Sequence, residues 1–293
     1  MSSIDLKEPE SYRLFFLLSD MLGKKGSHLM NQADKIETIR LTGGQRAVLK
    51  PAKSWRQGEV ALLLHRIRSP GLPRCLGISG LDDRPDFRDL PLVFLESPAG
   101  ENQILIEYLE GVSLRDYPQE QVTPDRLLAW FNQVLEALAW IMQISGRPFV
   151  HSDISPENII IGPQDQACLI DFSDSLLMEN GMDMVDYPLF GKEGYSAPEL
   201  YQGTISPASD LYSLAMSFLS VLACQPASQL DPKSQDKWLR KLGHPLRDHL
   251  ATCLKQAPQA RLEGIRGTPY AQLVEDLMRR PRRPDPSPDL MAG

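Results

Sequence analysis

The chain has 293 residues, of which 42% are hydrophobic and 24% are charged, and its formal net charge is -7 at pH 7. A chain of this length and composition can bury a sizeable core, as one domain or as two lobes. The negative charge provides no general attraction to nucleic-acid phosphates or anionic lipid, so we expect neither nucleic acid nor a membrane surface as a partner.

The four cysteines lack the CxxC spacing of metal and redox motifs. We therefore expect ordinary buried thiols, no disulfide or zinc site, and a cytoplasmic location. Charged residues interrupt the first ten positions, which predicts no secretory signal. The uncharged stretch 211–230 contains several serines and a proline, and it predicts a buried helix followed by a loop, with no membrane span.

The N-terminal part of the chain predicts a β-hairpin after a loose start. Residues 1–11 are polar and predict a flexible segment, while residues 12–18 fit the start of a helix or of a strand equally well. Apolar residues then alternate from Ile36 to Leu41, a glycine turn follows at 42–45, and a second strand ends at Lys50.

The following elements change from strands to helices. Residues 59–67 predict a helix that stops before a Ser-Pro-Gly turn, and the apolar runs 90–95 and 104–109 predict two more strands. From residue 124 to 144, apolar residues recur at three- and four-residue steps, which predicts a long helix. This order favours a small β-rich lobe followed by a larger α-rich lobe, with a ligand site in the cleft between them.

Two short segments carry the residue types that phosphoryl transfer requires. Asp153 and Asn158 lie five positions apart in a loop, and Asp171 follows two predicted short strands. An aspartate can accept the proton of an attacking hydroxyl, while an asparagine oxygen and a second carboxylate can hold Mg²⁺ against a triphosphate. A plain surface turn is the alternative, and the flanking strands disfavour it.

These segments, Phe149–Asn158 and Leu169–Ser173, resemble the catalytic loop and the metal-binding Asp-Phe-Gly segment of protein kinases. The resemblance implies ATP and Mg²⁺ as cofactors, Asp153 as the catalytic aspartate, and Asn158 and Asp171 as metal ligands. Phe172 is expected to pack inward.

The resemblance extends over about Lys35 to Leu277 and implies an α+β fold, bilobal and protein-kinase-like. The implied parts are a β-rich N-lobe at residues 12–108, an α-helical C-lobe at 109–280, and a disordered proline-rich tail at 281–293.

The first lobe supplies the residues that would bind the nucleotide. Lys50 resembles the strand lysine that contacts the α and β phosphates, and Glu59 is its implied carboxylate partner. Glu107 and Leu109 resemble the interlobe hinge, whose backbone groups read the adenine edge, and Ile106 takes the gatekeeper position.

The second lobe supplies scaffold residues. Ala197-Pro198-Glu199 matches the Ala-Pro-Glu segment of the family, which implies a buried ion pair between Glu199 and Arg261. Asp210 is expected to hold the backbone of the catalytic loop. Because aminoglycoside- and choline-type phosphotransferases generally lack Ala-Pro-Glu, this segment favours a protein kinase over a small-molecule kinase.

The phosphate-covering loop departs from the family, because the pattern G-x-G-x-x-G is absent. Residues 28–33 contain no glycine, and the alternative segment, residues 22–27, has two glycines but needs a longer connection to the hairpin. Fewer backbone N–H groups can then approach the phosphates closely, so we expect weaker nucleotide binding.

Four single positions also depart from the family. Ser152 replaces the usual arginine, so we expect activity without phosphorylation of the activation segment at Ser175, Tyr187 or Ser196. Ser155 replaces the usual lysine, and Lys192 could supply the lost cation to the γ phosphate. An exposed loop lysine is the alternative. Ser173 replaces glycine and removes backbone freedom next to Phe172.

The resemblance implies a protein serine/threonine kinase that transfers the γ-phosphoryl group of ATP to a protein substrate. The first alternative is a pseudokinase that acts as a nucleotide-binding interaction module, which the departures favour. A small-molecule phosphotransferase comes third.

Overall fold

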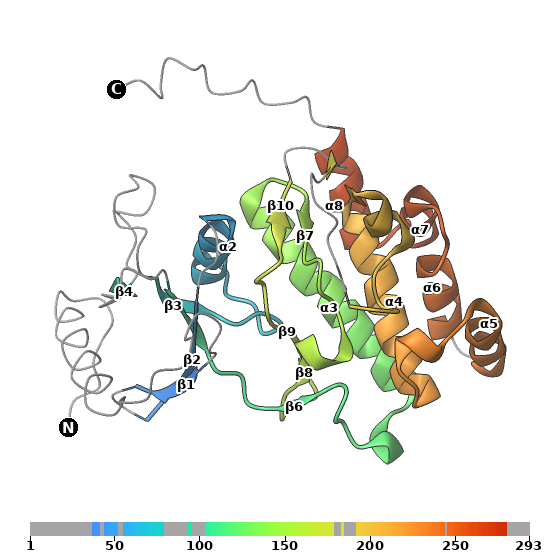
Figure 1. The fold of residues 1–293 in the computed structure, drawn as a ribbon, viewed down its shortest axis with the longest axis horizontal. Coiled ribbons are helices and arrows are strands. Elements are labelled where there is room, and N and C mark those ends of the chain that lie inside the picture. The colour runs from blue at the N-terminus through green and yellow to red at the C-terminus, as the bar shows by residue number, and fades with distance from the viewer. Residues whose placement is uncertain are drawn as a thin grey trace. The chain divides into compact units, whose positions relative to one another are not determined.

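The computed structural model describes residues 37–41, 44–51, 55–78, 93–94, 103–178, 183–184, 192–243 and 245–279 (Figure 1). The chain forms two compact units: the first contains residues 1–117 and 157–175, and the second contains residues 118–156 and 176–293. The chain thus passes between units three times, whereas the sequence predicted one boundary after residue 108. Several expectations concern positions outside the described residues, namely 1–11, 12–18, 22–27, 28–33, Tyr187 and 281–293.

The first unit is built on a five-stranded sheet in the order β1-β2-β5-β3-β4. β3 and β4 are parallel, and the other neighbours are antiparallel. The predicted hairpin is confirmed, because β1 pairs with β2 from Glu37↔Leu49 to Arg40↔Arg46. The strands are β1 (Glu37–Arg40), β2 (Arg46–Pro51), β3 (Cys75–Ile78), β4 (Val93–Phe94) and β5 (Gln103–Glu107).

Alternation along β2 gives the sheet two different faces. Ala47 and Leu49 are buried in a small apolar cluster with Leu105 of β5. Side chains of a strand alternate between faces, so Lys50 lies on the opposite face. A shift of one residue in register would exchange the two sets, and burial of the apolar set therefore fixes the register that places Lys50.

Helix α2 (Trp55–Arg66) contacts β3 in the first unit. The predicted helix is confirmed, although it begins at Trp55 and not at Glu59. Its buried face includes Val60, Ala61 and Leu64, and His65 Nδ1 lies 3.0 Å from the carbonyl oxygen of Cys75.

A three-stranded sheet brings residues 157–175 into the first unit. The strands are β6 (Val112–Ser113), β8 (Ile159–Ile161) and β9 (Ala167–Leu169), in the order β6-β8-β9. The Leu169 N–H also donates to Gly71 O at 3.0 Å. Gly111 is required beside this sheet, because its φ is +157° and an added Cβ would lie 2.5 Å from Ile161 O.

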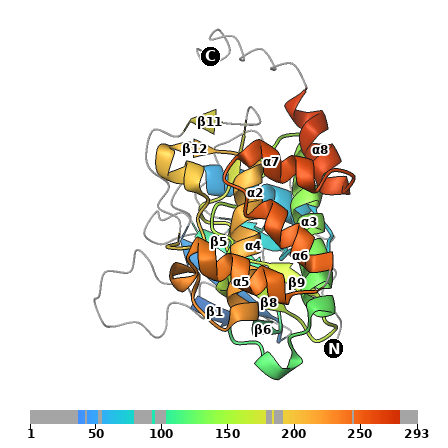
Figure 2. The same ribbon diagram turned by 90° about the vertical axis from the view of Figure 1, so that its right-hand side faces the viewer.

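The second unit is mainly helical, with α3 and α4 at its centre. The long helix predicted at 124–144 is confirmed as α3 (Pro124–Ser145); the Thr123 side chain caps its first turn and Gly146 ends it in a left-handed conformation. The buried helix predicted within 211–230 is confirmed as α4 (Pro207–Ala223). Figures 1 and 2 show α8 beside α3 and α6 beside α4, and these pairs are in contact.

The remaining elements of the second unit are short. They are η2 (Gln119–Gln121), β7 (Phe149–Val150), β10 (Leu176–Leu177), β11 (Asp183–Met184), η4 (Pro198–Gln202), β12 (Thr204–Ile205), η5 (Ala227–Gln229), α5 (Pro232–Lys241), α6 (Pro245–Cys253), α7 (Pro258–Gly264) and α8 (Pro269–Met278). β7 pairs with β10 and β11 pairs with β12.

Helix α3 is also long and apolar enough to cross a membrane by length and composition, with a mean hydropathy of 1.3 over its best window. Half of that window is buried inside the structure, and the core helix of a soluble protein passes the same test. This helix is therefore weak evidence for a membrane span.

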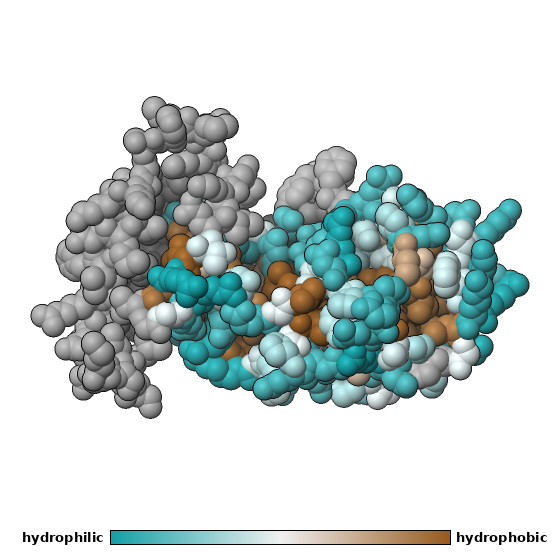
Figure 3. Space-filling model, turned by 90° about the horizontal axis from the view of Figure 1, so that it is seen from below, coloured by the Kyte–Doolittle hydropathy of each residue, from teal (hydrophilic) through white to brown (hydrophobic). Residues whose placement is uncertain are grey.

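One face of the described part of the molecule is largely polar. Figure 3 shows this face, on which hydrophilic residues surround smaller hydrophobic areas. Among the cysteines, Cys75, Cys168 and Cys253 are buried as predicted, but the prediction was wrong for Cys224, which is exposed. Cys224 lies at the C-terminal cap of α4 with φ of +52°, where the chain leaves the helix.

Candidate active site

The first unit brings two of the predicted site residues into direct contact. Lys50 lies near the end of β2 and is 8% exposed. Its ammonium Nζ lies 3.1 Å from Asp171 Oδ1 and 3.0 Å from Ser173 Oγ. Asp171 follows β9 and has φ of +61°, a conformation that only a small share of non-glycine residues adopt. The structure thus places a cation against the carboxylate that the sequence predicts as a metal ligand.

A backbone hydrogen bond holds Asn158 near this pair. It ends the short helix η3 (Pro156–Asn158), and its carbonyl oxygen accepts a hydrogen bond from the Ile170 N–H at 2.9 Å. The pairing of β8 with β9 therefore holds Asn158 beside the residue that precedes Asp171. An amide and a carboxylate oxygen are the hard donors that Mg²⁺ prefers, so the residues present fit this metal.

Phe172 packs inward, as predicted, and is 3% exposed. Its ring lines a small, mainly apolar pocket of the first unit, and α2 provides one side of that pocket. Glu59 lies on α2 next to this lining and is half-buried. The pocket is lined by Lys50, Val60, Ala61, Leu64, Ile104, Ile106, Phe172 and Ser173.

The predicted hinge is held by a cluster that the sequence did not indicate. The Glu107 N–H donates to Arg74 O at 2.8 Å, and the Glu107 carboxylate accepts from the Arg74 N–H at 3.2 Å. The Arg46 guanidinium lies 3.8 Å from the centre of the Tyr108 ring and forms an ion pair with Glu110 at 2.5 Å. Leu109, between these residues, is half-buried.

In the second unit, Asp210 holds the loop that carries Asp153, as predicted. Its Oδ2 accepts from the His151 N–H at 2.6 Å and its Oδ1 accepts from the Ser152 N–H at 3.1 Å. Burial raises the pKa of Asp210 to about 7, and these two hydrogen bonds oppose the rise. Ser152 has φ of +70°, so the two amides point to one carboxylate from a strained turn. Asp153, the next residue, is half-buried.

Two residues that depart from the family lie in different environments of the second unit. Ser155 is 1% exposed, and its hydroxyl has no hydrogen-bond partner within the described part of the chain. Lys192 is exposed, and its ammonium lies 5.7 Å from the centre of the Tyr195 ring. The exchange of cations between positions 155 and 192 stays a prediction.

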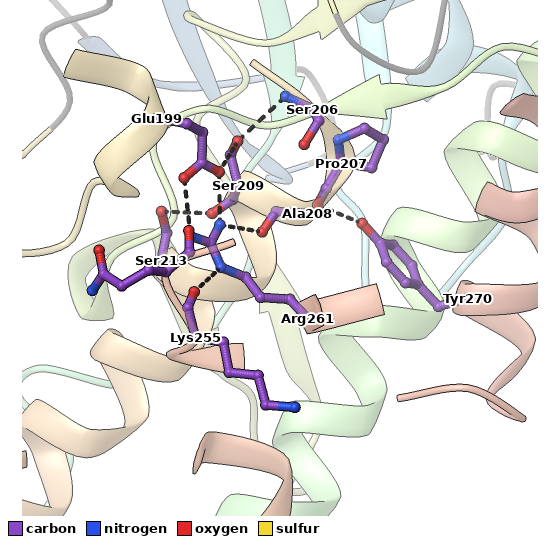
Figure 4. Close-up of polar contacts among 10 residues, drawn as sticks. Glu199, Ser206, Pro207, Ala208, Ser209, Ser213, Lys255, Arg261 and Tyr270 are labelled. Carbon is purple, nitrogen blue, oxygen red and sulfur yellow. Dashed lines mark hydrogen bonds and ion pairs between the residues drawn. The ribbon is translucent and has the colours of Figure 1, made fainter. Parts of the chain in front are cut away.

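The predicted ion pair between Glu199 and Arg261 is confirmed (Figure 4). Both guanidinium Nη atoms donate to the carboxylate, at 2.6 and 2.9 Å, and the Arg261 side chain is fully buried. Arg261 also donates to the carbonyl oxygens of Lys255, Gln256 and Ala208. Ser209 Oγ donates to Glu199 at 2.8 Å, so the pair is satisfied on both sides.

The structure therefore places the predicted site residues in two groups. Lys50, Glu59, Glu107, Leu109, Asn158 and Asp171 belong to the first unit, whereas Asp153 and Lys192 belong to the second. A strand lysine in contact with an aspartate that follows two short strands, an asparagine beside it, and a separate loop aspartate held by its backbone are typical of kinase-type phosphotransferases.

Comparison with known proteins identifies the family. The protein kinase domain matches residues 94–277, which is more than half of the chain, and the chain therefore belongs to the protein kinase family. The predicted α+β protein-kinase fold is confirmed, with β-sheets in the first unit and mainly helices in the second.

Curated relatives are similar at low identity. Maternal embryonic leucine zipper kinase of Xenopus tropicalis is 29% identical over 123 residues, which are 41% of this chain and 18% of that protein. Mitogen-activated protein kinase kinase 7 of Arabidopsis thaliana is 26% identical over 165 residues, 56% of this chain and 47% of that protein. The putative L-type lectin-domain containing receptor kinase V.8 of Arabidopsis thaliana is 29% identical over 213 residues, 71% of this chain and 32% of that protein. The chain thus spans less than half the length of each of these relatives.

Proposed function

We propose that this protein transfers the γ-phosphoryl group of ATP to serine and threonine hydroxyls of a protein substrate. The observation that carries the proposal is the contact of Lys50 with Asp171, with Asn158 held beside it by the pairing of β8 and β9. Membership of the protein kinase family supports ATP, Mg²⁺ and a protein acceptor as the reactants.

The predicted site residues of the first unit would have the following roles. Lys50 binds the α and β phosphates, and Glu59 holds Lys50 in place. The backbone at Glu107 and Leu109 orients the base. Asn158 and Asp171 hold Mg²⁺, which neutralises the charge of the phosphates when it is bound.

Residues of the second unit would orient and deprotonate the acceptor hydroxyl. Asp153 orients the hydroxyl and accepts its proton, while Asp210 fixes the backbone on which Asp153 stands. Lys192 would supply a cation to the γ phosphate in place of the lysine that Ser155 replaces. The choice of serine and threonine over tyrosine rests on the resemblance, and the cytoplasmic location rests on the cysteine usage.

The proposal is tested with radiolabelled ATP, Mg²⁺ and generic protein acceptors, followed by phosphoamino-acid analysis. We expect labelled phosphoserine or phosphothreonine with the wild type, and a loss of at least about a hundredfold in rate with Asp171→Asn, because positioning and charge stabilisation supply nearly all of the catalysis. Labelled phosphotyrosine alone would overturn the proposed acceptor. Equal rates for both proteins would overturn the proposed role of Asp171.

A second function, a pseudokinase that binds nucleotide without turnover, is favoured by one specific observation. The Ser173 hydroxyl, at the position where the family usually has glycine, donates to Asp171 Oδ1 at 2.7 Å and competes with a metal for that oxygen. Nucleotide binding with no phosphoryl transfer above the Asp171→Asn background would establish this alternative.

A further inference from the structure

Ser173 completes a closed triangle of polar contacts in the first unit. Its hydroxyl lies 2.7 Å from Asp171 Oδ1, Lys50 Nζ lies 3.0 Å from that hydroxyl, and Lys50 Nζ lies 3.1 Å from the same Asp171 oxygen. The Lys50 side chain is 9% exposed and the Asp171 side chain 36% exposed. Two of the three groups are charged, so each contact is stronger than one between neutral groups.

The direction of each hydrogen bond follows from the chemistry of the three groups. An ammonium only donates and a carboxylate only accepts, so the Ser173 hydroxyl must accept from Lys50 and donate to Asp171. Asp171 Oδ1 therefore receives two donors at once. The glycine that is usual at this position has no side-chain oxygen, so of these three contacts it would keep the one between Lys50 and Asp171.

The local backbone holds the hydroxyl in this position. Phe172 is buried, and its carbonyl oxygen accepts from the Ser175 N–H at 3.3 Å, which closes a tight turn over residues 172–175. Asp171 stands in the left-handed region with φ of +61°. Ser173 is therefore the second residue of this turn, directly after a buried aromatic residue, and its hydroxyl lies at the charged pair.

We propose that Ser173 is a positioning residue that holds Lys50 to Asp171, so that both donors compete with Mg²⁺·nucleotide for Asp171 Oδ1. This inference rests on the proposed function, because Lys50 and Asp171 are taken as the phosphate and metal ligands. According to this proposal, Ser173 sets the Mg²⁺ concentration that nucleotide binding requires.

The size of the effect follows from the loss of one donor. Removal of the hydroxyl takes away one charge-assisted hydrogen bond that competes with the metal, and we expect the Mg²⁺ concentration for half-maximal nucleotide binding to fall about tenfold. A tenfold change corresponds to about 1.4 kcal/mol, which is close to the lower end of the range for a hydrogen bond to a charged group.

The experiment is a Mg²⁺ titration of the binding of a fluorescent ADP analogue to the full chain, with Ser173→Ala and Ser173→Gly compared with the wild type. Ser173→Thr keeps the hydroxyl and should behave like the wild type. Ser113→Ala is the matched control, because Ser113 Oγ donates to the Asp116 carboxylate at 2.8 Å in the same unit and outside the triangle. Thermal melting of each variant verifies that it is folded.

The outcomes separate this inference from the proposed function. A lower half-saturating Mg²⁺ concentration in Ser173→Ala or Ser173→Gly, with Ser173→Thr and Ser113→Ala unchanged, supports the positioning role of Ser173. An unchanged half-saturating Mg²⁺ concentration would overturn the proposal. A higher concentration would also overturn it, because the hydroxyl would then assist metal binding. If the wild type itself showed no Mg²⁺-dependent binding of the nucleotide, the proposed function and the positioning role of Ser173 would both be overturned.

Discussion

Removal of the charge of Glu199 is expected to destabilise the second unit strongly. In Glu199→Gln the shape of the side chain is kept, but the fully buried guanidinium of Arg261 loses its countercharge. The three carbonyl oxygens that also accept from Arg261 stay in place, yet none of them neutralises the cation.

The expected loss is about 3–5 kcal/mol, the range for removal of one partner of a buried ion pair. With a urea dependence of about 2 kcal/mol per molar, this loss lowers the unfolding midpoint by roughly 1.5–2.5 M. The variant Glu275→Gln, whose arginine partners are exposed, is the control. Its partners are Arg279, at 3.0 Å and 72% exposed, and Arg266, at 3.5 Å and 69% exposed, and such pairs each contribute less than about 1 kcal/mol.

The assay is equilibrium unfolding in urea, followed by tryptophan fluorescence, for which the fully buried Trp130 of α3 is a reporter in the same unit. The double variant Glu199→Gln with Arg261→Met should be more stable than the sum of the two single losses predicts. Each single variant leaves one buried charge without its partner, whereas the double variant leaves none. A midpoint shift for Glu199→Gln no larger than that of Glu275→Gln, or strict additivity in the double variant, would refute the reasoning.

Three further predictions concern the second unit. The pKa of Asp210 is raised from 3.8 to about 7 by burial, so its contribution to stability is full below the unfolded pKa and is lost as the pH rises through about 7; urea unfolding between about pH 4 and pH 7 should show this decline in the wild type and not in Asp210→Asn. Gly194 has φ of +82° and its Cβ would lie 2.3 Å from Ser228 N, so Gly194→Ala should lower the melting temperature by at least about 5 °C, and an unchanged melting curve would contradict the geometry. Lys192→Ala should lower turnover at least about tenfold if Lys192 replaces the missing cation; unchanged turnover would leave Lys192 as an exposed loop lysine.

Local patterns predicted part of the elements, and helices α5 to α8 were not among them. The hairpin of β1 and β2 and helix α3 follow from alternation or from three- and four-residue steps within one segment, and the structure places them within a few residues of the prediction. The pairing of Glu199 with Arg261 was predictable only through the family resemblance, because the two residues are sixty-two positions apart.

Contacts between distant segments with no pattern of their own were not predictable. Arg46 and Glu110 are sixty-four positions apart, and neither charge belongs to a periodic run, so their ion pair at Tyr108 left no signal in the sequence. The sequence identified Ser173 as a departure from glycine, but its hydrogen bonds depend on where β2 brings Lys50. The exposure of Cys224 likewise depends on where α4 ends.

The role proposed for Asp153 is to accept the proton of a protein hydroxyl in a working kinase. The most direct measurement is the rate of phosphoryl transfer from ATP by Asp153→Asn and by the wild type, with nucleotide affinity measured on the same samples. We predict a rate lower by about 10²–10⁴-fold, the usual contribution of a positioned general base, with nucleotide affinity essentially unchanged. Equal rates for the two proteins would contradict the account.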